Sequence, residues 1–167
     1  MKSDRGRVLW CLKQPRGIRL EAQNKILAGA YLKKARSSLN MLNAAIEKEE
    51  KEWAATIAYY TRYYAVYALF QRCGIVSEIH DCTIAAFGYL FSESGIDTKE
   101  IHDELLVSKE NRIDAQYYIS AETEIPEGDA GKAGTFVLVI EELMDKLDDD
   151  VIDRVRDKLK KLLADTP

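Results

Sequence analysis

Apolar residues recur at spacings of three and four along most of the chain, which is the period of an amphipathic helix rather than of a strand. The pattern begins at Leu20 and is interrupted where glycine, proline or clustered acidic residues occur. It predicts helical segments near residues 21–48, from the charged run 47–52 to Cys73, over 78–93, from Asp97 towards Pro126, over 135–147 and over 151–164. We therefore predict an all-α fold.

Residues that commonly begin and end helices stand at the ends of these segments. Gly74 follows the second segment at the position that favours a left-handed cap, and Asp97 with Glu100 forms a capping box. Residues 136–140 are rich in β-branched side chains, but no second run of this kind is present to pair with them, so we predict a helix here. Short connections between long helices predict an antiparallel up-and-down helical bundle, with four main helices and one or two C-terminal helices.

The first nineteen residues differ from the rest of the chain. They contain six Lys or Arg residues against the single acid Asp4, together with Gly6, Pro15 and Gly17. This composition predicts an irregular basic arm over 1–19, for which a frayed terminus is favoured over a nucleic-acid contact. Residues 20–167 are predicted to form a single domain of ordinary size.

Composition narrows the class of protein. The 167 residues are 47% hydrophobic and 31% charged, with a net charge of −4, which excludes a disordered chain and a protein that binds polyanions by bulk charge. No apolar run reaches the ~18 residues of a membrane span, and no signal-peptide pattern follows the basic N-terminal residues. We expect a cytoplasmic protein with no membrane contact. The odd number of cysteines, Cys11, Cys73 and Cys82, predicts reduced thiols.

No metal or cofactor site is predicted from the motifs. The chain has no C-x-x-C pair, and Glu78 and His80, like Glu100 and His102, are two residues apart, whereas carboxylate-bridged metal bundles need a spacing of three. Phosphate-binding glycine loops, dinucleotide-binding glycine patterns and nucleophile-elbow motifs are absent from the sequence.

The second predicted helix is unusual because five of the nine tyrosines lie in it. Its helical period places Tyr60, Tyr64 and Tyr67 on one stripe and Tyr59 and Tyr63 on the neighbouring one. One interpretation is core packing with the phenol hydroxyls at the surface. The other is a symmetric dimer face or a base-stacking surface, because tyrosine is enriched at interfaces that are apolar at one end and wet at the other.

Several motifs in order resemble the HEPN domain family, and in particular its small stand-alone prokaryotic members. The resemblance spans roughly residues 30–147 and is carried by residues 58–74 (AYYTRYYAVYALFQRCG), 78–80 (EIH), Phe87, Ser94-Gly95 and 112–117 (RIDAQY). It implies a helical bundle that commonly forms a homodimer and has a nucleotide- or RNA-linked role. It also implies a minimal nucleotidyltransferase as partner, in an arrangement like that of toxin–antitoxin pairs.

Nuclease members of this family cleave RNA without a metal, using an arginine followed four to six residues later by a histidine. In this sequence the position after four intervening residues from Arg112 is Tyr117, Gln116 replaces the usual Asp, and no histidine follows. A tyrosine hydroxyl with its ordinary pKa near 10 is a poor general base at neutral pH. The resemblance therefore implies a phosphate-holding role for Arg112 and favours a protein that is not an enzyme.

Three hypotheses follow. The first is a non-catalytic nucleotide- or RNA-binding module whose candidate ligand-binding residues are Arg112, Tyr117, Tyr60, Tyr64, Tyr67 and His80. The second is a metal-independent RNase toxin with a non-standard site, in which folding brings His80 to Arg112 as the candidate catalytic residues. The third is a structural helical adaptor that contacts other proteins through its basic arm and the acidic segment 141–153.

Overall fold

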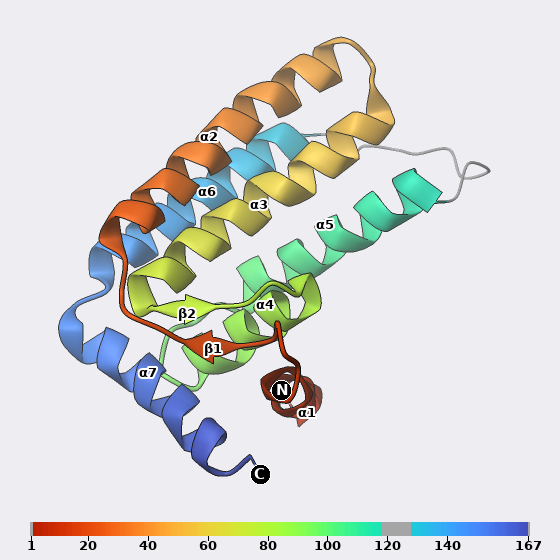
Figure 1. Ribbon diagram of the computed structural model, residues 1–167. Helices are drawn as coiled ribbons and strands as arrows, with labels where there is room; N and C mark the ends of the chain where they lie inside the picture. Colours follow the sequence, from red (N-terminus) through yellow and green to blue (C-terminus); the bar gives the residue numbers. More distant parts are fainter. Residues whose placement is uncertain (1, 118–127, 167) are drawn as a thin grey trace.

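The computed structural model describes residues 2–117 and 128–166. Helices dominate it, as the sequence predicts (Figure 1). The elements in chain order are α1 (Lys2–Leu12), β1 (Arg19–Leu20), α2 (Lys25–Glu47), α3 (Lys51–Cys73), β2 (Ile75–Val76), α4 (His80–Ala86), the π-helix η1 (Phe87–Phe91), α5 (Lys99–Tyr117), α6 (Asp129–Lys146) and α7 (Asp149–Ala164). The all-α prediction is confirmed, and the β-branched run 136–140 lies within α6.

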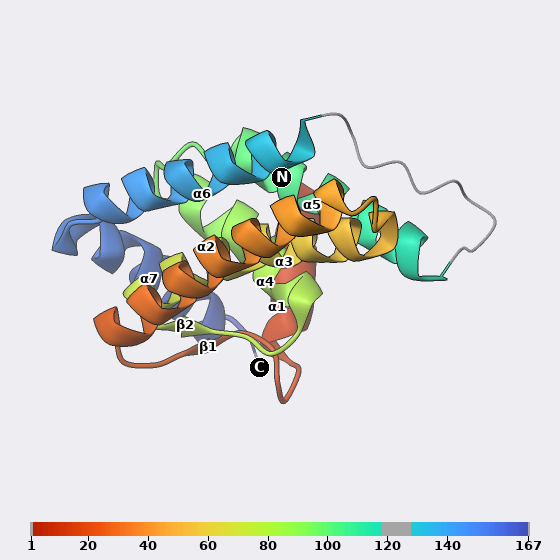
Figure 2. The same cartoon turned by 90° about the horizontal axis from the view of Figure 1, so that it is seen from above.

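Helix α3 is the centre of the bundle, in contact with α2, α5 and α6. It runs antiparallel to α2, and α6 forms a second layer behind this pair (Figures 1 and 2). Asn24 caps the N-terminus of α2, where its side chain accepts a hydrogen bond from the Leu27 amide, and Gly74 caps the C-terminus of α3 with a φ of 66°. The left-handed cap predicted at Gly74 is therefore confirmed.

The N-terminal segment corrects one of the predictions. Residues 2–12 are helical rather than irregular, and the Val8 and Cys11 side chains on α1 are completely buried. The chain then forms β1, which pairs antiparallel with β2 so that Arg19 lies opposite Val76. The sequence pattern missed α1 because a short basic helix carries little periodic apolar signal and is stabilised here by tertiary packing.

Cysteine pairing is a second correction. Cys11 on α1 and Cys82 on α4 form a disulfide between Cα atoms 5.5 Å apart, a separation within the ordinary disulfide range. The prediction of reduced thiols holds only for Cys73, which is free and buried. Burial raises the pKa of the Cys73 thiol to about 12, so it is protonated at neutral pH. An argument from cysteine number could not foresee that α1 packs against α4.

The segment predicted as one helix over 78–93 contains a π-helical turn. Helix α4 covers residues 80–86 and continues directly into η1, whose Phe87, Leu90 and Phe91 side chains are buried. Gly88 in this turn faces His102 of α5, and a Cβ at Gly88 would lie 2.7 Å from the imidazole ring. The absent side chain therefore allows α5 to approach the widened turn closely.

A buried arginine joins three helices of the bundle. The Arg62 side chain on α3 is 1% exposed, and its guanidinium is paired with Glu104 of α5 and Asp129 of α6, each at 2.7 Å. It also donates a hydrogen bond to the Ala58 carbonyl oxygen at 3.1 Å. A buried guanidinium is tolerated only when its donors are matched in this way.

Two searches of the described residues gave negative results. In 2–117 and 128–166, no helix combines the length and apolar character that a bilayer crossing requires. In the same residues, no cluster of three or more His, Cys, Asp or Glu side chains is arranged to hold a metal ion.

We predict that Arg62→Met lowers the free energy of unfolding by about 3 kcal/mol, because it leaves the Glu104 and Asp129 carboxylates facing an apolar side chain. Urea denaturation followed by circular dichroism measures this loss. Arg36→Gln is the matched control: it breaks a pair with Glu141 of α6 in which the arginine side chain is 62% exposed. Exposed pairs contribute less than about 1 kcal/mol, so equal losses in the two variants would contradict the role assigned to Arg62.

We also predict that reduction of the Cys11–Cys82 disulfide lowers the free energy of unfolding by up to about 4 kcal/mol, because the bridge closes a long loop in the unfolded chain. Thermal unfolding with and without dithiothreitol measures the change. Alkylation in denaturant without reductant should modify Cys73 alone. Modification of all three cysteines in that experiment would show that the bridge does not form.

Candidate functional site

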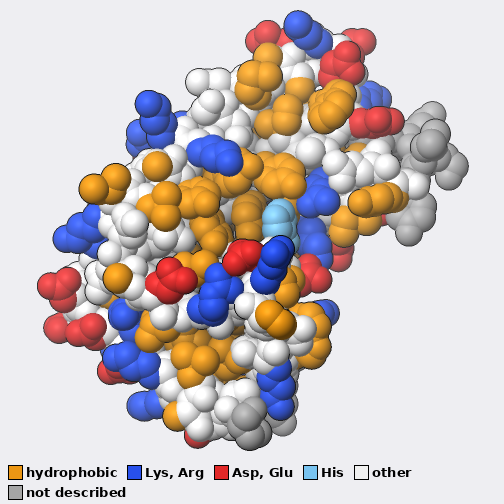
Figure 3. Space-filling model, viewed as in Figure 1, with side chains coloured by type: hydrophobic (Ala, Val, Ile, Leu, Met, Phe, Trp, Pro, Cys, Tyr) orange, Lys and Arg blue, Asp and Glu red, His pale blue; other side chains and the backbone are white. Residues whose placement is uncertain are grey.

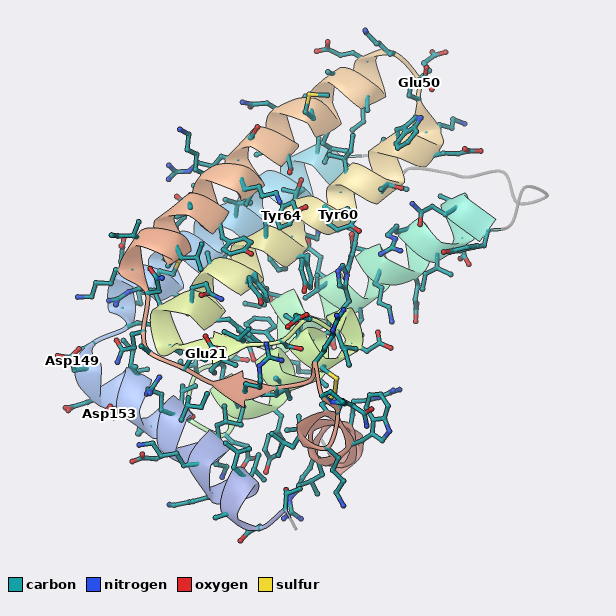
Figure 4. All side chains as sticks on the ribbon, in the orientation of Figure 1. Glu21, Glu50, Tyr60, Tyr64, Asp149 and Asp153 are labelled. Atoms are coloured by element: carbon teal, nitrogen blue, oxygen red, sulfur yellow. A yellow bond between two sulfur atoms is a disulfide. The ribbon has the colours of Figure 1, made fainter. Side chains whose placement is uncertain are left out.

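The tyrosines of α3 divide into an inner and an outer group. Tyr59, Tyr63 and Tyr67 are buried, whereas Tyr60 and Tyr64 are half-buried. Figure 4 shows Tyr60 and Tyr64 on the side of α3 that lies between α2 and α5 and is turned toward the viewer. Their rings are stacked, with centroids 5.5 Å apart. The tyrosines of α3 are therefore partly core and partly surface: the core interpretation is confirmed for Tyr59, Tyr63 and Tyr67, and the dimer-face or base-stacking interpretation stays a prediction for Tyr60 and Tyr64.

Tyr67 belongs to the core side of this division. It is 8% exposed, and its hydroxyl donates a hydrogen bond to the Ser77 carbonyl oxygen at 3.0 Å. The ring of Tyr31 on α2 packs edge-on against it at 4.7 Å. Because both ends of Tyr67 are enclosed, we leave it out of the ligand-contacting group proposed below.

His80 lies against the inner tyrosines at the first residue of α4. Its ring is nearly parallel to that of Tyr63, with centroids 4.2 Å apart, and its Nδ1 is 2.7 Å from the Tyr59 hydroxyl oxygen. The turn at Gly74 and the short β2 strand carry the chain from the end of α3 back to this position. His80 is therefore part of an aromatic stack rather than a helix cap, because the cap residue of α4 is Ile79.

Protonation states follow from this packing. Burial, and then the positive charge of Arg112, lower the pKa of His80 below its ordinary value, so the imidazole is neutral at pH 7. Burial raises the pKa values of Tyr59 and Tyr63, which keeps both hydroxyls protonated. When the Tyr59 hydroxyl donates to Nδ1 of His80, the imidazole proton is on Nε2.

Arg112 on α5 completes the group. Its guanidinium lies over the rings of Tyr59 and Tyr60, at 5.2 and 5.7 Å from their centroids. Gln116, one turn later, accepts a hydrogen bond from Arg112 Nε at 3.1 Å and donates one to Thr56 of α3 at 3.3 Å. Gln116 thus orients the guanidinium and links it to α3, a role that the motif comparison did not suggest.

A second cation lies on the other side of the outer tyrosines. The Lys34 ammonium of α2 is 4.1 Å from the centroid of the Tyr64 ring. Tyr60, Tyr64, His80, Arg112 and Lys34 together form a surface that we call the tyrosine face. Figure 3 shows hydrophobic side chains along this side of the molecule with an imidazole and Lys and Arg side chains beside them.

The remaining sequence candidate is not part of this surface. Tyr117 is 70% exposed at the last residue of α5, and no aromatic contact joins it to the α3 tyrosines among the described residues. The tyrosine face has the chemistry to bind an anion: a guanidinium that the rings hold in place, a neutral imidazole with one N–H donor, and two stacked rings that can accept a planar group. Within residues 2–117 and 128–166, the terminal nitrogens of Arg112 donate no hydrogen bond to the protein.

Sequence reasoning missed Lys34 of the tyrosine face and three further residues, Tyr59, Lys109 and Arg62, whose contacts only the fold shows. Tyr59 and Lys109 occupy positions that any core tyrosine or surface lysine could occupy, and only the fold shows that Tyr59 contacts His80 and that Lys109 pairs with Asp81. Arg62 looked like one more residue of the tyrosine helix. A charged residue within an otherwise aromatic and small-residue segment is the signal that could have identified it.

Comparisons with known proteins agree with the motifs. The model of the HEPN domain family matches residues 28–161, which is most of the chain. Searches of curated proteins and of solved structures gave no match. The match includes α3, α4 and α5, the three helices that carry the tyrosines, His80 and Arg112. On this evidence the chain belongs to the HEPN domain family.

Proposed function

We propose that this HEPN domain is a non-catalytic module that binds a nucleotide or RNA at the tyrosine face. Family membership supports a nucleotide- or RNA-associated role in general. The observation that carries the proposal is the position of Arg112, whose guanidinium lies over Tyr59 and Tyr60 and beside His80. A phosphate would accept hydrogen bonds from the Arg112 terminal nitrogens while a base stacks on Tyr60 or Tyr64.

Protein partners are a further part of the proposal. A homodimer, and a minimal nucleotidyltransferase as a separate partner, agree with the family resemblance. Large apolar side chains are exposed near the α2–α3 turn, including Trp53 at 64% and Met41 at 58%. Such side chains are common at protein interfaces. A single monomer mass in multi-angle light scattering at high concentration would contradict the homodimer.

One observation favours the metal-independent RNase as a second candidate. Folding brings His80 and Arg112 to the same tyrosines although 32 positions separate them in the sequence, since Tyr59 contacts both side chains. If His80 Nδ1–H instead donates to the Tyr59 oxygen, Nε2 of the neutral imidazole can accept the proton of a ribose 2′-hydroxyl, and the guanidinium can stabilise charge on the attacked phosphate. In such a step the 2′-oxygen displaces the 5′-oxygen from phosphorus, and the 5′-oxygen takes up a proton. The second candidate therefore has a base and a cation for the phosphate, but they are arranged differently from the family's single-helix motif.

We predict that Arg112→Gln weakens binding of a fluorescent single-stranded RNA about tenfold, because it removes charge-assisted hydrogen bonds to phosphate. Fluorescence anisotropy measures the change. The slope of log Kd against log salt concentration should decrease by the amount that corresponds to the loss of about one phosphate contact. Arg112→Lys should recover only part of the affinity, since an ammonium lacks the planar fork.

Lys99→Gln is the matched control, because it removes one exposed positive charge from the first residue of the same helix. Tyr60→Leu tests the stacking surface, and Tyr67→Phe is its control because the Tyr67 hydroxyl contacts only the interior. Equal losses of RNA affinity in Lys99→Gln and Arg112→Gln would show that binding depends on overall charge alone, and would contradict the proposed site.

We predict no RNA cleavage by the wild-type protein in the presence of a chelator. We also predict that His80 titrates below its ordinary pKa of 6.5 in an NMR titration. Because the folded pKa is lower than the unfolded one, His80 stabilises the fold less as pH falls from 6.5 through the folded value. Cleavage that disappears in both His80→Ala and Arg112→Ala would contradict the binding-only proposal and establish the second candidate.

A further inference from the structure

A cavity lies outside the tyrosine face, between α1, α4 and α5. Its volume is about 270 Å³, and its polar lining consists of Arg7, Asp81, His102 and Lys109. Ile84 and Leu106 provide apolar lining. None of the residues of the tyrosine face lines this cavity. Arg7 is the α1 residue that lines the cavity, and α1 packs against α4.

The charges around this cavity are predominantly positive. Arg7 and Lys109 are cations, and the one acidic side chain, Asp81, forms an ion pair with Lys109. One positive charge therefore remains in excess among the lining side chains, and the Asp103 carboxylate lies beside the His102 ring, with its Oδ1 3.6 Å from His102 Nδ1. The His102 side chain is 12% exposed, and its ring is seated over Gly88. Apolar lining beside these groups reduces the local dielectric constant, which strengthens attraction for an anion.

We propose that this cavity is a second anion site that takes a phosphate group, either free or carried by a small nucleotide. Arg7 offers a planar fork that matches two phosphate oxygens, and Lys109 offers an ammonium, while the His102 ring forms part of the lining beside them. The site is distinct from the tyrosine face but adjoins it, because the Asp81–Lys109 pair also acts on the pKa of His80. The proposal does not depend on RNA binding at the tyrosine face.

The Cys11–Cys82 disulfide holds one wall of this site. It ties α1, which carries Arg7, to the residue that follows Asp81 on α4. Without the bridge, α1 is held by noncovalent contacts, which include its packing against α4 and η1. Occupancy of the cavity therefore depends on the oxidised state of the two cysteines, and an anion bound there stabilises the oxidised, folded arrangement by mass action.

The two histidines of the chain provide one reporter for each site. His102 lines the cavity and His80 belongs to the tyrosine face, and the chain has no other histidine. Titration with inorganic phosphate, and separately with adenosine monophosphate, is followed by the NMR signals of the two imidazoles at fixed pH. Sodium chloride at matched ionic strength is the reference. A saturable shift of the His102 signal with either probe supports the site, and the preferred probe identifies the source of the phosphate group.

Arg7→Gln should weaken this binding about tenfold, whereas Arg5→Gln on the same helix should not change it, because Arg5 does not line the cavity. Arg112→Gln should also leave the phosphate-induced shift of the His102 signal unchanged. Reduction with dithiothreitol, or the Cys11→Ser/Cys82→Ser variant, should weaken binding of the probe at the cavity while the circular dichroism spectrum remains helical. A titration that shifts His80 alone, shifts neither ring, or responds equally to Arg5→Gln and Arg7→Gln would overturn the proposal.

Discussion

The structure depends on the burial of one positive charge at the centre of the bundle. Arg62 on α3 holds α5 through Glu104 and α6 through Asp129. The cost of removing a guanidinium from water is offset only when both carboxylates are in place, so the three helices can pack in one register. Arg112 lies eight residues after Glu104 on the same helix, and its position over Tyr59 and Tyr60 follows from that register.

The position of His80 depends on a separate set of short-range constraints. Gly74 reverses the chain after α3, β2 pairs with β1, and the Tyr67 hydroxyl binds the Ser77 carbonyl three residues before His80. These contacts return α4 to the tyrosines of α3. Two residues of the site therefore come from different elements that meet at α3, which explains why no short sequence motif contains both.

The sequence was sufficient to predict the elements whose pattern is local. The length of α3, its end at Gly74 and the helical state of residues 136–140 follow from periodicity, capping and the lack of a partner strand. What it could not predict depends on tertiary packing: α1, the Cys11–Cys82 bridge, the π-helical turn against His102, and the division of the tyrosines into buried and outer rings. Gln116 illustrates the difference. In the motif comparison, Gln116 is a residue that differs from the usual Asp of the family. In the fold, its side chain hydrogen-bonds to both Arg112 and Thr56 and so links α5 to α3.

The protonation states of the tyrosine face bear on the proposed binding role. Burial keeps the Tyr59 and Tyr63 hydroxyls protonated, and the same burial with the nearby Arg112 charge keeps His80 neutral. The face therefore presents hydrogen-bond donors and one weak base. Acid–base cleavage of RNA also needs a group that returns a proton to the leaving oxygen, and a His80 that is neutral at pH 7 carries no spare proton for that step in its resting state. An arginine held over aromatic rings needs no proton transfer to hold a phosphate, which supports the proposed binding of a nucleotide or RNA at this surface.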